Sequence, residues 1–247
     1  MRWIYLSPHL DDAVFSAGGL IYDQTQTGIP VQIWTFMCGY PPEGDLSPYA
    51  ELLHAQWGFS SAEETTRLRR EEDKRAATMV GAETLHFDFL DCIYLKGADG
   101  EWLYWDVEMP PQSADLGLPF QIAAEILTRL EPDDVVVCQL AVGSHVDHVL
   151  VRQAAELLKR PIVYDIDVPY IFYKQGDLEP KTAGLKESVY PITAAGVQHW
   201  QEAAIEYKSQ FAGLGEAFNT LERAQASIRA YWAERGGIRV LQQDSQA

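Results

Sequence analysis

The sequence predicts an α/β protein with a Rossmann-like, mostly parallel sheet, helices on both of its faces and C-terminal helices packed on it. The first observation is that apolar strand-like segments alternate with amphipathic helix-like segments. The second is the continuous apolar run 133–140 (DDVVVCQL), which is typical of a strand covered on both faces. The third is size: 247 residues with 47% apolar and 22% charged residues can bury one large core. We therefore expect a single domain over residues 1–247.

Five short segments are expected to form the strands, because they are rich in β-branched and aromatic residues and end at polar residues, Gly or Pro. They are residues 2–7, 30–37, 83–90, 133–140 and 161–168. Six segments with helical spacing of apolar residues are expected to form helices: 12–24, 62–80, 119–130, 145–159, 197–212 and 216–235. No strand is expected after Tyr170.

Two long segments, 39–61 and 91–118, interrupt the alternation directly after expected strands. Connections of that length are usually functional, disordered or interrupted by short helices. Both are rich in aromatic side chains, which either anchor the segments to the domain or stack on a substrate; the sequence leaves both readings open.

The charge balance excludes some classes of partner. With 19 Lys+Arg against 36 Asp+Glu, the net charge is −17, which disfavours binding to nucleic acids and to anionic membranes. No apolar run approaches the roughly 18 residues of a membrane span. Three scattered cysteines argue against a disulfide framework and favour a reducing compartment, so we expect a cytoplasmic protein. Homo-oligomerisation is left open.

The first chemically suggestive cluster follows the first expected strand. His9 and Asp12 are three residues apart, so both side chains can converge if the turn enters a helix. Imidazole and carboxylate together suit zinc or another divalent first-row metal. Asp11 lies between the two and is free to act as a base.

The second cluster follows the fourth expected strand. His145 and His148 lie at the start of a helix, so one could supply a third metal ligand while the other faces a substrate. Asp147 could hydrogen-bond an imidazole and raise its pKa. A simpler reading remains, in which Asp11 and Asp12 cap a helix and His145 merely begins one.

Taken together, the motifs of both clusters resemble the LmbE-like, or PIG-L, family of zinc-dependent N-deacetylases. The resemblance rests on the segments HLDD (9–12) and HVDH (145–148). It also rests on RREE (69–72), DCIY (91–94), DVPY (167–170) and YKSQ (207–210), which follow in the same order over roughly residues 2–211. Leu10, Leu95 and Gly143 depart from residues common in the family; these departures concern the substrate and the oxyanion geometry and not the metal.

The resemblance implies a role for each residue. His9, Asp12 and His148 would hold Zn²⁺, or another divalent first-row metal, and leave room for a water of lowered pKa. Asp11 would act as the general base and return the proton to the leaving amine. His145, kept cationic by Asp147, would stabilise the oxyanion.

Two further residues are expected to contact the substrate. Arg69 would reach substrate hydroxyls or order the pocket, although a helical ion pair with Glu72 is an equally good reading. Asp91 would accept hydrogen bonds from sugar hydroxyls.

Three hypotheses follow. The first is a zinc hydrolase that removes an N-acyl, most simply an N-acetyl, group from a small molecule containing an amino sugar such as an N-acetylglucosamine derivative. The second is a non-catalytic carbohydrate- or protein-binding α/β module that retains the metal motif. The third is a dinucleotide enzyme, suggested only by the glycine pair Gly18-Gly19, which lacks the GxGxxG pattern.

Overall fold

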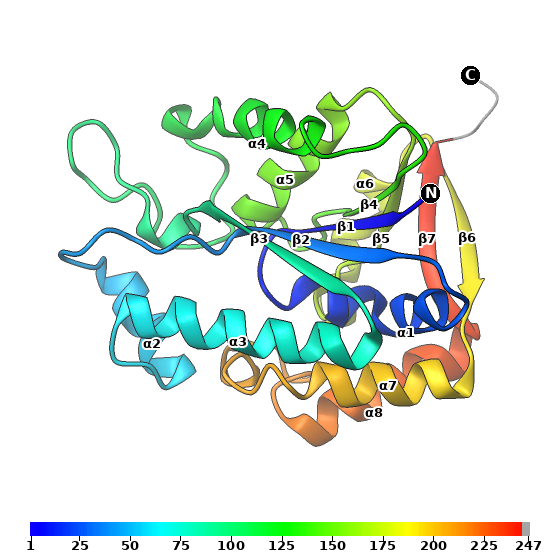
Figure 1. The fold of residues 1–247 in the computed structure, drawn as a ribbon. Helices are drawn as coiled ribbons and strands as arrows, with labels where there is room; N and C mark the ends of the chain where they lie inside the picture. Colours follow the sequence, from blue (N-terminus) through cyan, green and yellow to red (C-terminus); the bar gives the residue numbers. More distant parts are fainter. Residues whose placement is uncertain (244–247) are drawn as a thin grey trace.

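A computed structural model describes residues 1–243 and contains one seven-stranded sheet in the order β3-β2-β1-β4-β5-β7-β6 (Figure 1). Its strands are β1 (Trp3–Ser7), β2 (Val31–Met37), β3 (Glu83–Phe89), β4 (Val135–Gln139), β5 (Ile162–Asp165), β6 (Leu185–Pro191) and β7 (Gly237–Gln243). The five strands from β1 to β5 pair in parallel, whereas β7 runs antiparallel to both β5 and β6. The predicted α/β class and mostly parallel sheet are therefore confirmed.

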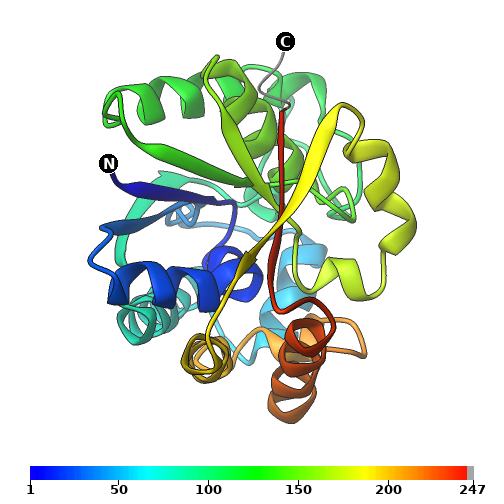
Figure 2. The same ribbon diagram turned by 90° about the vertical axis from the view of Figure 1, so that its right-hand side faces the viewer.

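Helices cover both faces of this sheet (Figure 2). They are α1 (Asp12–Gln26), α2 (Pro48–Trp57), α3 (Ala62–Val80), α4 (Leu118–Leu127), α5 (Val146–Leu157), α6 (Leu178–Lys181), α7 (Ala194–Ala204) and α8 (Leu221–Arg235). One layer contains α4 and α5, and the other contains α1, α3 and α7, with α8 packed on the outside of α7. Five short 3₁₀ helices complete the connections: η1 (Cys92–Tyr94), η2 (Ser113–Asp115), η3 (Tyr170–Phe172), η4 (Gln175–Asp177) and η5 (Phe211–Gly213).

The order of the strands decides where a ligand can bind. From β1 the chain proceeds to β2 and β3 on one side, and then returns to place β4 and β5 on the other side of β1. The carboxyl ends of β1 and β4 are therefore neighbours at the point where the strand order reverses. In open α/β sheets this is the place where a crevice forms.

Helix α3 shows how local sequence defines an element. Ser61 caps its N-terminus by accepting a hydrogen bond from Glu64 N, and the Glu64 carboxylate accepts one from Ser60 N. Gly81 ends the helix with φ +76°, a left-handed conformation that favours glycine. The predicted bounds of this helix, 62–80, are confirmed.

The glycine pair in α1 serves helix packing. A Cβ at Gly18 would lie 2.6 Å from Trp200 Cδ1, and a Cβ at Gly19 would lie 2.7 Å from Ile192 Cδ1. Both glycines lie inside α1, so they let α7 approach closely and do not form a phosphate-binding turn between a strand and a helix. The dinucleotide hypothesis loses the feature on which it depended.

The C-terminal region differs from the prediction. The expected helix 197–212 ends at Ala204, and the expected helix 216–235 begins only at Leu221, after its cap Thr220. Strands β6 and β7 were not expected, because β6 is a largely exposed edge strand and β7 acquires its partners only when the chain returns beside β5.

Each of the two long segments is interrupted by short helices, which was one of the alternatives expected from its length. Residues 39–61 contain α2, and residues 91–118 contain η1 and η2 within otherwise irregular chain. None of the helices over residues 1–243 combines the length and the apolar character needed to cross a bilayer.

Candidate metal centre and active site

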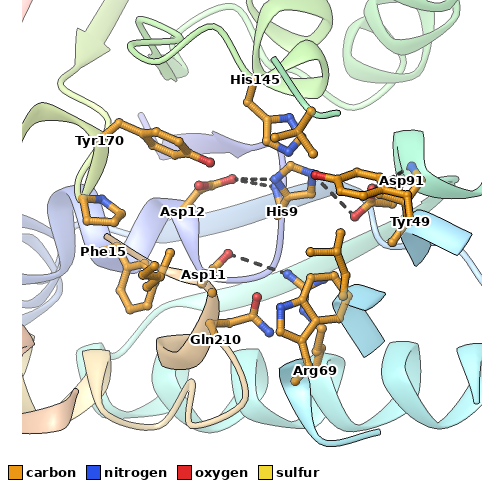
Figure 3. Close-up of a pocket in the computed structure, with 17 residues that line it drawn as sticks. His9, Asp11, Asp12, Phe15, Tyr49, Arg69, Asp91, His145, Tyr170 and Gln210 are labelled. Atoms are coloured by element: carbon orange, nitrogen blue, oxygen red, sulfur yellow. Dashed lines mark hydrogen bonds and ion pairs between the residues drawn. The ribbon is translucent and has the colours of Figure 1, made fainter. Parts of the chain in front are cut away.

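The two histidine-containing clusters meet at the carboxyl ends of β1 and β4 (Figure 3). Within this group, one oxygen of Asp12 lies 3.3 Å from His9 Nδ1 and also 3.3 Å from His148 Nε2. The ring of His145 lies beside both, with centroids 4.6 Å from that of His9 and 5.0 Å from that of His148. The predicted ligands His9, Asp12 and His148 therefore converge on one point.

The unpaired atoms of the cluster fit a metal ion. His148 Nε2 is buried and has no hydrogen-bond partner, although it faces the Asp12 carboxylate. The second nitrogen of each ligand imidazole is held by a carboxylate: His9 Nε2 lies 3.0 Å from Asp147 Oδ2, and His148 Nδ1 lies 3.2 Å from Asp167 Oδ1. Ligand histidines in metal sites are oriented in this way, and the nitrogen and oxygen donors suit zinc or a neighbouring first-row metal.

The electrostatics of the site also favour a cation. Asp11, Asp12, Asp91 and Asp147 are all buried around His9. Burial opposes a charge on His9, but hydrogen bonds to Asp12 and Asp147 outweigh it and raise the pKa of this imidazole well above its usual range. The buried carboxylates of the pocket therefore outnumber the cationic side chains that could neutralise them.

Asp11 lies beside the metal ligands and faces the cavity (Figure 3). Burial, reinforced by the Asp12 carboxylate, raises the pKa of Asp11 to about 6, while Arg69 and His9 oppose the rise. A carboxylate with its pKa near neutrality is suited to accept and return a proton.

Arg69 is turned toward the cavity and not along its own helix. Its Nη2 atom lies 3.9 Å from Asp11 Oδ1, and its guanidinium lies 4.7 Å from the centre of the Trp57 ring. Glu72 instead accepts hydrogen bonds from the backbone and the hydroxyl of Ser209. The described ion pairs therefore support the reading in which Arg69 orders the pocket over the reading in which it pairs with Glu72.

The predicted partnership of Asp147 with His145 is wrong. The Asp147 carboxylate contacts His9 and the backbone N–H of Cys92, and only its backbone N–H donates to His145 Nδ1, at 3.2 Å. Burial, followed by the charges of His9 and His148, lowers the pKa of His145 well below its usual range. Both observations favour a neutral imidazole with its proton on Nε2 over the cation that the sequence led us to expect.

A cavity of about 180 Å³ opens beside these groups. Its polar wall contains His9, Asp11, Asp12, Arg69, Asp91 and His145. The opposite wall is mostly apolar and comes from α2, η1, η5 and the chain after β5. Of the predicted site residues, only His148 and Asp147 are absent from its lining, since they lie behind His9 and Asp12.

Some contributors were not predicted as site residues. Asp167, Tyr170 and Gln210 belong to motifs noted in the sequence, but their contacts with His148 or with the cavity appear only in the structure. The aromatic residues of the long segments divide between two roles: Tyr49 and Trp57 line the cavity, whereas others pack elsewhere or are exposed.

The family model described as PIG-L, GlcNAc-PI de-N-acetylase, matches residues 4–158. No curated protein sequence matches significantly. The chain is similar to the zinc-inhibited form of a teicoplanin deacetylase, with 28% identity, 100% of each chain covered and a TM-score of 0.84. It is also similar to a deacetylase of the A40926 pseudoaglycone, with 28% identity, coverage of 98% and 96%, and a TM-score of 0.75.

A further solved structure is more distantly similar to this chain. The 4-carboxy-2-hydroxymuconate hydratase of Pseudomonas putida is 17% identical with a TM-score of 0.53, covering 100% of this chain and 97% of its own. That similarity shows the fold alone, because one fold can host different reactions. The family match and the two deacetylase structures go further: this chain belongs to the PIG-L, or LmbE-like, family and is an N-deacetylase hydrolase.

Proposed function

We propose that this protein removes an N-acyl group, most simply N-acetyl, from a small molecule that contains an amino sugar. Zn²⁺, or another divalent first-row metal, would be held by His9, Asp12 and His148. The observation that carries the proposal is the convergence of His9 Nδ1 and His148 Nε2, each at 3.3 Å, on a single oxygen of Asp12 beside the cavity. The similar solved structures include a teicoplanin deacetylase and a deacetylase of the A40926 pseudoaglycone, which supports removal of an acyl group from a small molecule.

The metal, when bound, supplies Lewis acidity and makes a water more acidic. Asp11 accepts the proton of the attacking water as the C–O bond forms, and then donates it to the nitrogen of the leaving amine as the amide C–N bond breaks. Its raised pKa allows both steps near neutral pH.

His145 would stabilise the developing oxyanion as a neutral hydrogen-bond donor. Its Nδ1 accepts a hydrogen bond from the backbone N–H of Asp147, so its Nε2 carries the proton. This N–H would donate a hydrogen bond to the oxyanion. A neutral imidazole avoids placing another positive charge beside the metal. Asp147 acts indirectly in this scheme, by orienting His9.

Arg69 and Asp91 are proposed to bind the sugar. Both line the cavity, and together they offer a hydrogen-bond donor and an acceptor to neighbouring hydroxyls. The cavity of about 180 Å³ beside these two side chains is proposed to receive the sugar that carries the N-acyl group. The remainder of a larger conjugate would lie outside the cavity.

We also propose a cytoplasmic location, which is supported by three buried cysteines that form no disulfide. A single domain, and a possible homo-oligomer, remain predictions.

The test is acetate release from a panel of N-acetylhexosamine glycosides by protein depleted of metal and then supplied with one equivalent of Zn²⁺. We expect activity that depends on the metal and falls about 10²- to 10⁴-fold in Asp11→Asn, because a general base contributes that much. His148→Ala should lose metal and activity together, whereas the control His199→Ala, half-buried on α7 where its ring stacks on Tyr22, should change neither. Binding of metal and sugar without any acyl release would instead favour the non-catalytic module.

A further inference from the structure

A second set of possible ligands lies behind the catalytic cavity. Cys92, at the start of η1, His145, which caps α5, and Asp147, in the first turn of α5, each offer one donor atom, and these atoms lie within 4.8 Å of one another. All three side chains are buried, with exposed fractions of 0%, 7% and 0%. The cysteine and Asp147 are not among the ligands that hold the catalytic metal.

An independent observation marks this set as a place for a cation. Asp147 Oδ2 forms hydrogen bonds with His9 Nε2 at 3.0 Å and with the Cys92 backbone N–H at 3.1 Å. Asp147 Oδ1, in contrast, is buried without any hydrogen-bond partner. A buried carboxylate oxygen without a donor is costly, and a bound cation would relieve the cost.

We propose that Cys92, His145 and Asp147 form a second, inhibitory site for a thiophilic divalent cation such as Zn²⁺ or Cd²⁺. Thiolate, imidazole and carboxylate together suit such ions. Around a tetrahedral zinc the ligand atoms lie roughly 3.3–3.6 Å apart, so the present spacing closes with small side-chain rotations.

Binding exchanges a proton for the metal. Burial, followed by the charges of Asp147 and Asp91, raises the pKa of the Cys92 thiol well above its usual range, so the free protein holds a protonated thiol. On binding, the S–H bond breaks, the proton leaves to solvent and sulfur forms the bond to the metal, with no change in oxidation state.

The metal would inhibit by removing His145 from catalysis. A neutral imidazole has one lone pair, which accepts the Asp147 backbone N–H through Nδ1. Coordination through either ring nitrogen uses that lone pair and draws the ring toward Cys92. The same metal would bind Asp147, which holds His9.

The inhibition rests on the proposed function, but the second site itself does not, so binding is measured first. Metal-free protein is dialysed against Cd²⁺, and bound metal is counted while the ultraviolet thiolate-to-cadmium charge-transfer band is recorded. We expect two equivalents and the band in the wild-type protein, and one equivalent without the band in Cys92→Ser and Cys92→Ala. The serine variant preserves the side-chain volume in case the smaller residue impairs folding.

Cys138→Ala is the matched control, because Cys138 is equally buried but lies within β4 and belongs to none of the candidate metal-binding sets of residues 1–243. It should bind as the wild type does. A single equivalent in the wild type, two equivalents without the band, or an unchanged band in Cys92→Ser would overturn the second site, and none of these results would bear on the catalytic site.

The inhibition is then measured as the ratio of acetate release at one equivalent of Zn²⁺ to that at excess Zn²⁺. We expect a ratio of about 10 or more in the wild type and near 1 in Cys92→Ser, since loss of a metal-site residue weakens binding by at least about 10- to 100-fold. Equal ratios in the two proteins would show that occupation of this site is not inhibitory.

Discussion

Each histidine assigned to the catalytic metal is oriented by a buried carboxylate behind it. His9 presents Nδ1 to Asp12 because Asp147 holds its Nε2, whereas His148 presents Nε2 because Asp167 holds its Nδ1. The two rings therefore approach the same oxygen through different nitrogens. This arrangement sets both the direction and the basicity of the ligands.

Removing the carboxylate behind His148 should weaken metal binding without removing a ligand. In the Cys92→Ser background, which isolates the catalytic site, Asp167→Ala is expected to lower the affinity for Zn²⁺ by about 10- to 100-fold. Competition with a chelator of known affinity measures this change. The exposed carboxylate control Asp133→Ala should leave the affinity unchanged, and an equal affinity in Asp167→Ala would refute the positioning role.

At the scale of elements, the close contact between α1 and α7 secures the helix that carries Asp12. Trp200 is fully buried in α7, and its indole N–H donates to the Phe15 carbonyl of α1 at 3.1 Å. Only glycine at position 18 allows this approach, because a Cβ there would come within 2.6 Å of the indole.

A larger side chain at this contact should therefore destabilise the fold. Gly18→Leu is expected to lower the free energy of unfolding by about 1–3 kcal/mol or more, through overpacking in the core. Urea denaturation followed by circular dichroism measures the loss. Gly176→Leu is the control, since a Cβ at Gly176 meets no atom within 4 Å; equal losses in the two variants would contradict the packing argument.

At the scale of the whole molecule, the net charge of −17 coexists with a site built around cations. The cavity wall carries Asp11, Asp12 and Asp91 against Arg69, and a bound divalent cation would offset the remaining negative charge.

One ion pair links regions of the chain that are 132 residues apart and makes stability depend on pH. Arg2 donates through Nε to Asp134 Oδ1 at 3.0 Å and through Nη2 to Asp134 Oδ2 at 2.6 Å. Burial opposes the charge on Asp134, but the hydrogen bonds from Arg2 and the Glu131 backbone outweigh it and lower the pKa of this carboxyl.

Because the pKa of Asp134 is lower in the folded state, its stabilising contribution is present above the unfolded pKa of about 4 and is lost as pH falls through the folded value. Asp134→Asn should therefore cost about 1–2 kcal/mol near neutral pH and almost nothing in strong acid. Urea titrations across this pH range measure the difference. Asp133→Asn should track the wild type, and a loss in Asp134→Asn that does not vary with pH would contradict the ionic explanation.

Most of the fold was predictable because its signals are local. The apolar run of β4 and the capped helix α3 each carry their own pattern, and both were identified correctly. Strands β6 and β7 could not be identified in this way, since β6 is exposed and β7 becomes a strand only by pairing with β5 and β6. The site was predictable to the same extent. HLDD and HVDH could be recognised because they are contiguous motifs, whereas the contact of Asp167 with His148 joins separate elements and could not.

The sequence by itself determined the α/β class, the family motifs and the residues that face the metal position, because these depend on residue type and short spacing. The tertiary structure alone decided which carboxylate holds which histidine. It placed Asp147 behind His9 and not beside His145, left His145 neutral, and brought Cys92 next to Asp147. Hydrogen-bond partners and the loss of solvent depend on strands and loops distant in the chain, and no local pattern specifies them.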